Sequence, residues 1–296
     1  MRLTKQIIWG IIFTTVLFFD CQRESESPSV IEGTVVSTDG IRISYQVQGG
    51  GEPALVFVHC WSCDRSYWNE QLNHLARRHK VVAIDLAGHG ESGLGRESWT
   101  MAAFGGDVVA VVEKLDLDPV VLIGHSMGGP VILEAARRIP DRVIGLVGVD
   151  TFQDFEAKYT DEQREEFFAP MRINFTEATR QFVRNFMFTE NTDSALVEKI
   201  VADMSAAPPE VGIGALEAVF QYDYELALQR LRAPIRCINS DKYPTNVEAN
   251  RRHSDSFAVV LMPGVGHFVM MEDPETFNRL LEENVNELVR TASSSE

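Results

Sequence analysis

A serine flanked by glycines, set between two apolar segments, limits what this chain can fold into more than any other feature. Residues 119–123 are short and apolar and predict a buried strand, while residues 130–138 predict a helix. The sequence Gly-His-Ser-Met-Gly-Gly lies between them, at positions 124–129. A serine at such a corner has a strained backbone and an exposed hydroxyl, so Ser126 is the candidate nucleophile. The alternative is a glycine-rich turn whose serine only faces solvent.

Composition restricts the classes of partner. The 296 residues are 45% hydrophobic and 24% charged, as in one large globular domain with room for an insertion. The formal net charge is −16, which disfavours nucleic acid, because binding to it depends on Lys and Arg that neutralise phosphates. No metal-ligand spacing is present, and we expect neither a metal nor an organic cofactor.

Two of the four cysteines, Cys60 and Cys63, have C-x-x-C spacing. They could form a redox pair or a disulfide, or they could be two unrelated small residues near a loop. We favour the second interpretation, because the thioredoxin-like context of a redox motif is missing. Two cysteines are also too few for a four-thiolate zinc site. The role of the pair stays open.

The first 29 residues predict a signal or anchor segment followed by a flexible tether. After a basic start, residues 7–19 are almost wholly apolar, which is shorter than the roughly 20 residues that span a membrane. Cys21 follows where a bacterial lipoprotein is lipidated, although Asp20 replaces the usual small residue. Residues 22–29 are rich in Ser and Glu. We expect export to a bacterial envelope with lipid anchoring at Cys21; an uncleaved anchor and a secreted form are the alternatives.

Strand and helix patterns alternate along most of the remaining chain. The predicted strands are 33–36 and 41–47 as a hairpin, then 54–58, 80–84, 119–123, 143–149, 234–239 and 257–261. The predicted helices between and after them are 68–79, 102–115, 130–138 and a terminal helix that starts at Pro274 with Asp273 as its N-cap. This alternation predicts a parallel sheet with helices on both faces.

The alternation stops in residues 151–230, which predict helices and no core strand. The predicted helices are one starting at 161, then 176–186, 193–204 and 211–220. Such a block between two sheet strands is an inserted cap, and it divides the core into residues 30–150 and 231–296. We expect most of the cap phenylalanines to pack against each other and a few to face a ligand; these residues are Phe167, Phe168, Phe175, Phe182, Phe186 and Phe188.

Four sequence motifs, taken together and in their order along the chain, indicate a protein family. They are the serine corner, His59-Cys60-Trp61 after the third strand, Asp85 to Ser92 after the fourth, and Gly264-Val265-Gly266-His267 after the last. Over residues 33–288 the chain resembles the α/β-hydrolases of the esterase, lipase and non-haem haloperoxidase group. The resemblance implies the α/β-hydrolase fold, a mostly parallel eight-stranded sheet with helices on both faces and an inserted helical cap.

A serine hydroxyl needs a base to remove its proton at neutral pH. His267 lies in a glycine loop after the last strand and is the candidate base, and later the acid for the leaving group. His125 is expected to pack within the corner, and His59 and His89 to be hydrogen-bonded parts of loops.

The third member of the triad has two candidates. Asp150 comes directly after the predicted strand 143–149. It lies 24 residues beyond Ser126, a position that some family members use for their acid. Asp241 follows the first strand after the cap, where the family usually places its carboxylate, but Tyr243 occupies the usual acid position and Ser240 the usual glycine position. We place Asp150 narrowly ahead of Asp241.

The resemblance implies that the backbone N–H groups of Trp61 and Met127 form the oxyanion hole. Cys60 stands where the family usually has glycine, so a positive φ at that position would be strained in this chain.

The function implied is that of a serine hydrolase that forms an acyl-enzyme on carboxylic esters or lactones of small molecules. An amidase, a carbon–carbon bond hydrolase and a perhydrolase could use the same triad. A binding protein with this fold and no catalysis is the alternative from another class. The expected partner is a small ester-like substrate, with membrane contact only through the N-terminal segment, and the oligomeric state is left open.

Overall fold

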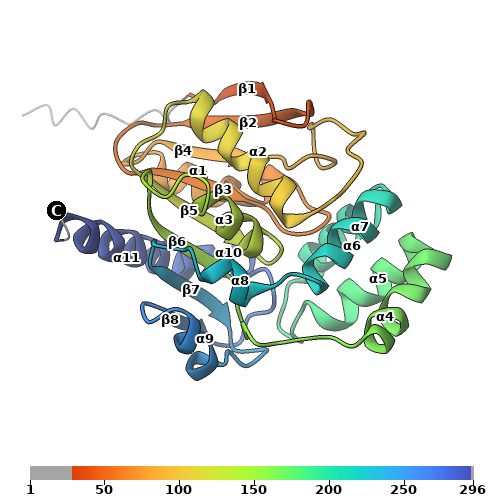
Figure 1. Cartoon of the computed structure of the whole chain (residues 1–296). Coiled ribbons are helices and arrows are strands. Elements are labelled where there is room, and N and C mark those ends of the chain that lie inside the picture. Colours follow the sequence, from red (N-terminus) through yellow and green to blue (C-terminus); the bar gives the residue numbers. More distant parts are fainter. Residues whose placement is uncertain (1–28, 295–296) are drawn as a thin grey trace, which may run out of the picture.

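The computed structural model describes residues 29–294, in which one mixed sheet forms the centre of the molecule (Figure 1). Its eight strands in this range are β1 (Ile31–Val36), β2 (Arg42–Gln48), β3 (Ala54–Val58), β4 (Val81–Ile84), β5 (Val120–His125), β6 (Val143–Val149), β7 (Ile235–Ser240) and β8 (Ala258–Met262). Their spatial order is β1-β2-β4-β3-β5-β6-β7-β8. Only the β1–β2 and β2–β4 pairs are antiparallel. The predicted mostly parallel eight-stranded sheet is confirmed.

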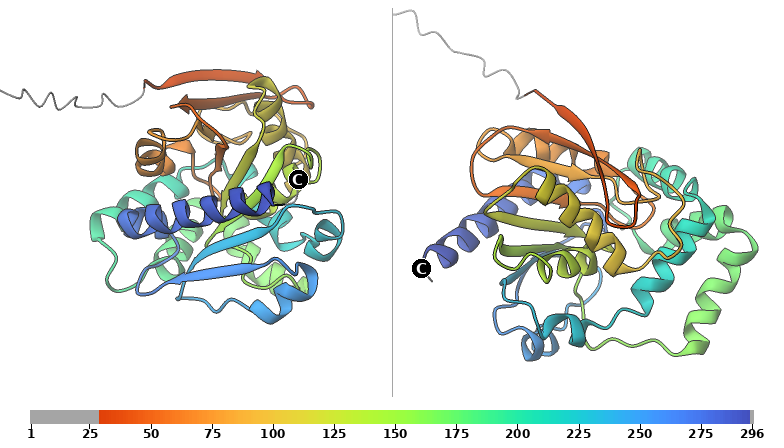
Figure 2. Two further views of the ribbon diagram at one scale, coloured as in Figure 1. Left: turned by 90° about the vertical axis from the view of Figure 1, so that its left-hand side faces the viewer. Right: turned by 45° about the horizontal axis from the view of Figure 1, so that its top comes forward.

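Helices cover both faces of this sheet, as the complete burial of β3, β4 and β5 requires. On one face, α2 (Met101–Lys114) packs against α3 (Gly128–Ala136); on the other, α1 (Asn69–Leu75) contacts α11 (Pro274–Ser293) (Figure 2). The remaining core helices are η1 (Arg65–Trp68), α9 (Val247–His253) and α10 (Val269–Glu272). Asp273 caps α11 by accepting a hydrogen bond from the Thr276 N–H at 3.0 Å, as predicted.

The strand register brings the carboxyl ends of the central strands to one edge of the sheet. His125 at the end of β5 lies opposite Val149 at the end of β6, and Val149 lies opposite Ile238 of β7. Residues that follow these strands therefore meet, although they are far apart in the sequence. Ligands of open α/β sheets bind at this edge.

Five helices lie between β6 and β7 and are called the cap here. They are α4 (Asp161–Ile173), α5 (Phe175–Phe186), α6 (Ser194–Ser205), α7 (Pro209–Phe220) and α8 (Tyr224–Leu228). The first four correspond to predicted helices, whereas α8 was not predicted. Figure 1 shows α4 to α7 beside the core and α8 next to α3, which it contacts.

The predicted N-terminal leader and its Cys21 lie outside the described residues. Within residues 29–294, no helix combines the length and apolar character that crossing a membrane requires. The same range holds no cluster of three or more His, Cys, Asp or Glu side chains arranged to bind a metal ion.

Candidate active site

The serine corner has the backbone that the sequence predicts. β5 ends at His125 and α3 begins at Gly128, and between them Ser126 has a φ of 52°. The Ser126 N–H donates to the Val149 carbonyl at 3.0 Å, which fastens the corner to β6. A Cβ at Gly124 would collide with the Gly128 carbonyl, and one at Gly128 would lie 2.7 Å from the Val58 carbonyl. Glycines are therefore required for the strand and helix to approach this closely.

His267 contacts a buried carboxylate. Its Nδ1 lies 2.6 Å from Oδ2 of Asp150, which is 2% exposed. The other oxygen of Asp150, Oδ1, accepts hydrogen bonds from the backbone N–H of Ser240 at 2.9 Å and from its hydroxyl at 3.1 Å. Because the carboxylate accepts a hydrogen bond from the Nδ1–H group, the proton stays on Nδ1, and Nε2 of His267 is left with the lone pair that a general base needs.

The second predicted acid, Asp241, has a different partner. It is exposed, and its Oδ1 accepts a hydrogen bond from the Gly264 N–H at 3.0 Å. The Asp241 N–H donates to the Met262 carbonyl, so the residue continues the pairing of β7 with β8. Of the two candidates, the structure brings Asp150 to His267. Sequence reasoning missed Ser240 as the residue that orients Asp150; its place at the end of the neighbouring strand was the available signal.

A cavity of about 540 Å³ contains the candidate residues. It is lined from the core by Cys60, Trp61, Ser126, Met127, Asp150 and His267. Aromatic and apolar side chains supply most of the rest: Phe152, Tyr159, Phe182, Phe186, Met187, Met204, Leu216, Val219, Phe220, Tyr222, Tyr224 and Tyr243. Of the six cap phenylalanines considered from the sequence, Phe182 and Phe186 line the cavity, in agreement with the expectation that only a few would do so.

The two predicted oxyanion donors border this cavity. Within the described part of the chain, the backbone N–H groups of Trp61 and Met127 have no hydrogen-bond acceptor, so both are free to bind a ligand oxygen. Cys60 does not have a positive φ; the residue with that backbone in this loop is Ser62, at 55°. The cysteine in the usual glycine position is therefore not strained.

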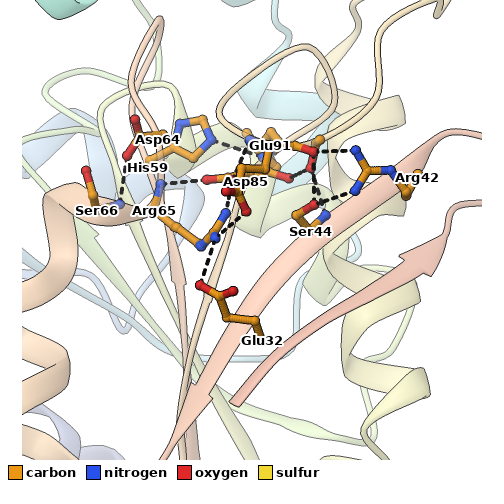
Figure 3. A network of polar contacts seen from close by, with 11 residues as sticks. Glu32, Arg42, Ser44, His59, Asp64, Arg65, Ser66, Asp85 and Glu91 are labelled. Atoms are coloured by element: carbon orange, nitrogen blue, oxygen red, sulfur yellow. Dashed lines mark hydrogen bonds and ion pairs between the residues drawn. The ribbon is translucent and has the colours of Figure 1, made fainter. Parts of the chain in front are cut away.

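A polar network holds the loop that carries Trp61 (Figure 3). The buried Asp85 carboxylate accepts hydrogen bonds from the backbone N–H groups of Arg65 at 2.8 Å and Glu91 at 2.9 Å, and it is ion-paired with the Arg65 guanidinium. Arg65 also pairs with the Glu91 carboxylate at 2.6 Å. On the cap side, the Trp61 indole donates to the Gly212 carbonyl at 2.7 Å. The loop is thus fastened both to the core and to the cap.

Three other histidines are buried parts of the scaffold, as expected. The Nδ1 of His59 donates to the Cys60 carbonyl at 2.7 Å, and its Nε2 accepts from the Leu86 N–H at 3.0 Å. The Nε2 of His125 donates to the His267 carbonyl at 2.8 Å. These bonds suit neutral imidazoles, and burial lowers the pKa of His59 to about 4 and that of His89 to about 3.

This burial predicts that the protein loses stability on mild acidification. Unfolded histidines bind protons below their usual pKa of 6.5, whereas His59 stays neutral in the folded state until about pH 4. The contribution of neutral His59, His89 and His125 is therefore complete above pH 6.5 and is lost as the pH falls toward 4. Asp107, whose pKa burial raises to about 6, and Asp85, whose pKa burial also raises, act in the opposite direction, but they are two groups against three.

Urea unfolding followed at a series of pH values measures this effect. The free energy of unfolding should decrease steadily between pH 6.5 and about 5, by several kcal/mol at most. His74 is the matched control because its imidazole is 43% exposed, so H74Q should keep the same slope. A free energy of unfolding that is constant or increases on acidification would contradict the prediction.

Comparisons with known proteins agree with this architecture. The family model described as the alpha/beta hydrolase family matches residues 55–280. The chain is 25% identical to 3-oxoadipate enol-lactonase 2 of Acinetobacter baylyi, over 83% of this chain and 94% of that one. It is 36% identical to a dihydrolipoyllysine-residue acetyltransferase component of the acetoin cleaving system of Cupriavidus necator, but over only 36% of this chain and 29% of that one.

Among solved structures, a thermophilic esterase from Thermogutta terrifontis superposes with a TM-score of 0.76 at 25% identity, covering 87% of this chain and 99% of that one. The family model alone spans well over half of the sequence, from β3 into α11. The chain therefore belongs to the alpha/beta hydrolase family.

Proposed function

We propose that this protein is a serine hydrolase that cleaves carboxylic esters or lactones of small molecules through an acyl-enzyme. One observation carries the proposal: Ser126, on its strained corner, borders the same cavity as His267, whose Nδ1 lies 2.6 Å from the buried Asp150. The similarity to an esterase and to an enol-lactonase supports this choice of substrates.

The residues divide the chemistry in the following way. Nε2 of His267 removes the proton of the Ser126 hydroxyl as Oγ attacks the substrate carbonyl, and Asp150 stabilises the imidazolium that forms. The N–H groups of Trp61 and Met127 stabilise the oxyanion. His267 then gives the proton to the leaving alcohol oxygen, and water repeats the sequence to release the acid. Export and lipid anchoring at Cys21 stay predictions from the sequence.

The charge of the cavity favours uncharged substrates. No lysine or arginine is among its lining residues in the described chain, whereas the carboxylates of Asp150 and Asp154 are. A carboxylate on the substrate would lose its hydration there without gaining a cationic partner, which costs free energy. The aromatic lining instead suits an apolar acyl chain or an aryl group.

A matched pair of aryl esters tests both parts of the proposal. We expect 4-butyryloxybenzamide to be hydrolysed with a kcat/KM at least about tenfold higher than 4-butyryloxybenzoate, which corresponds to about 1.4 kcal/mol. The two compounds differ only in a neutral amide and a carboxylate, and chromatography of the released phenol measures both rates. Equal rates would contradict the preference for uncharged substrates. Failure of a wider series of esters and lactones to react would contradict the hydrolase itself.

A further inference from the structure

The Cys60–Cys63 pair, which the proposed mechanism does not use, is brought together by a tight turn. The Cys63 N–H donates to the Cys60 carbonyl at 3.3 Å, and the two Sγ atoms lie 2.7 Å apart. Both are free thiols, 1% and 4% exposed. This contact goes against the favoured sequence interpretation of two unrelated small residues. Loop geometry, without any thioredoxin-like context, is enough to pair them.

The two cysteine residues border different cavities. Cys60 lines the cavity of Ser126 and His267. Cys63 lines a second cavity of about 370 Å³, together with Ser62 and His89. The third free cysteine in the described residues, Cys237, is buried and borders neither cavity. Their position beside a cavity therefore distinguishes Cys60 and Cys63 from Cys237.

We propose that Cys60 and Cys63 are a redox-active pair that hydrogen peroxide converts to a disulfide and a dithiol reductant restores. One sulfur, as the thiolate, attacks a peroxide oxygen; the O–O bond breaks, and the departing hydroxide takes a proton to become water. The second sulfur attacks the resulting sulfenic acid, the S–O bond breaks, and a second water leaves. Two thiols and one peroxide thus give one disulfide and two waters. The thiols lose the two electrons that the peroxide gains.

The order in which the two sulfurs react follows from their surroundings. Burial, together with the neighbouring Cys60 thiol, raises the pKa of Cys63, so Cys63 keeps its proton. Because Cys60 lines the substrate cavity, from which peroxide arrives, it is the first to react, and Cys63 is the resolving thiol. Because both sulfurs are buried, oxidation should be slow compared with that of an exposed low-pKa cysteine.

The pair flanks Trp61, and this links the redox state to the active site. A disulfide would close a covalent ring around Trp61 and so change the restraint on the turn that carries the Trp61 N–H. Displacement of an oxyanion donor by a fraction of an ångström weakens stabilisation of the transition state. Oxidation should therefore lower kcat several-fold. This effect on turnover rests on the proposed function, whereas formation of the bond does not.

The test uses the full chain, reduced, freed of reductant and treated with hydrogen peroxide. Mass spectrometry of the peptide that contains residues 60–63 should show the loss of two hydrogens, reversed by dithiothreitol, with a parallel reversible fall in ester turnover. C63A should show no loss of two hydrogens, because Cys60 alone can gain oxygen but cannot form the bond, and C60A should show neither change; C237A, the buried cysteine outside both cavities, should keep both. If C63A does not fold, C60A and the dithiothreitol reversal in the wild-type chain provide the same test.

Several outcomes would overturn the proposal. One is a pair that stays reduced under conditions that oxidise other residues, or a Cys60 that gains oxygen without forming the bond. Another is a loss of turnover that persists in C60A or resists dithiothreitol, which would indicate sulfoxidation of Met127, Met187 or Met204 in the cavity instead. A bond without any change in kcat would overturn the link to Trp61. If the protein hydrolyses no ester, the peptide masses still decide whether the bond forms.

Discussion

Replacement of Ser126 by alanine should lower kcat for ester hydrolysis by about 10⁶-fold while the protein stays folded. The hydroxyl oxygen is the atom that forms the acyl bond in the proposed mechanism, and no other hydroxyl can replace it at the strained corner. The substitution removes one oxygen from a half-buried side chain that borders an open cavity, so the loss of stability should be small. Turnover of an aryl ester and the thermal melting temperature measure the two effects.

A fluorophosphonate distinguishes a catalytic serine from a binding protein with the same fold. The wild-type chain should gain one covalent phosphonyl group, and S126A should gain none. S98A is the matched control, because Ser98 is exposed and lies away from the cavity lining; it should be labelled and active like the wild type. Labelling that persists in S126A would place the nucleophile elsewhere, and an unlabelled, folded wild-type chain would favour the binding protein.

The second large effect is expected from the carboxylate partner of His267. Asp150→Asn should lower kcat by about 10⁴-fold. The asparagine can still accept the Ser240 hydrogen bonds through its oxygen, but its amide N–H₂ then faces Nδ1 of His267 and donates to it. That reverses the tautomer, places the proton on Nε2 and removes the base that Ser126 needs.

Asp241→Asn provides the matched control for this substitution. It makes the same chemical change on an exposed side chain that accepts one hydrogen bond, from Gly264. Its kcat should stay within a few-fold of the wild-type value, and its melting temperature should change little. If D241N lost more activity than D150N, the acid would be assigned wrongly, and a rearrangement of the loop after β7 during catalysis would be needed to explain it.

Local patterns were enough to predict the elements that carry the site. Glycines around Ser126 are needed because the backbone of α3 passes against β5 and β3, and this requirement is visible in the sequence itself. Short apolar runs predicted the buried strands, and Asp273 with Pro274 predicted the start of α11. Each of these signals comes from neighbouring residues, whose conformations are limited by sterics and by hydrogen bonds within a few positions.

Contacts between distant residues could not be predicted in the same way. The sequence left Asp150 and Asp241 nearly equal, because each follows a strand that ends at the same edge of the sheet. The register of β6 with β7 places Asp150 beside Ser240 and turns its carboxylate toward His267, 117 positions away. The contact between the sulfurs of Cys60 and Cys63 likewise depends on the turn that the loop adopts between core and cap.

The sequence by itself therefore determined the class of fold, the serine corner and the histidine loop, since all three follow from short-range sterics and hydrophobic patterning. Only the tertiary structure decided which carboxylate meets His267, which aromatic side chains of the cap border the cavity, and that no lysine or arginine of residues 29–294 lines it. These features depend on strand register and on how the cap packs over the sheet edge. Both arise from many contacts between segments far apart in the chain, and none of these contacts is encoded at any one position.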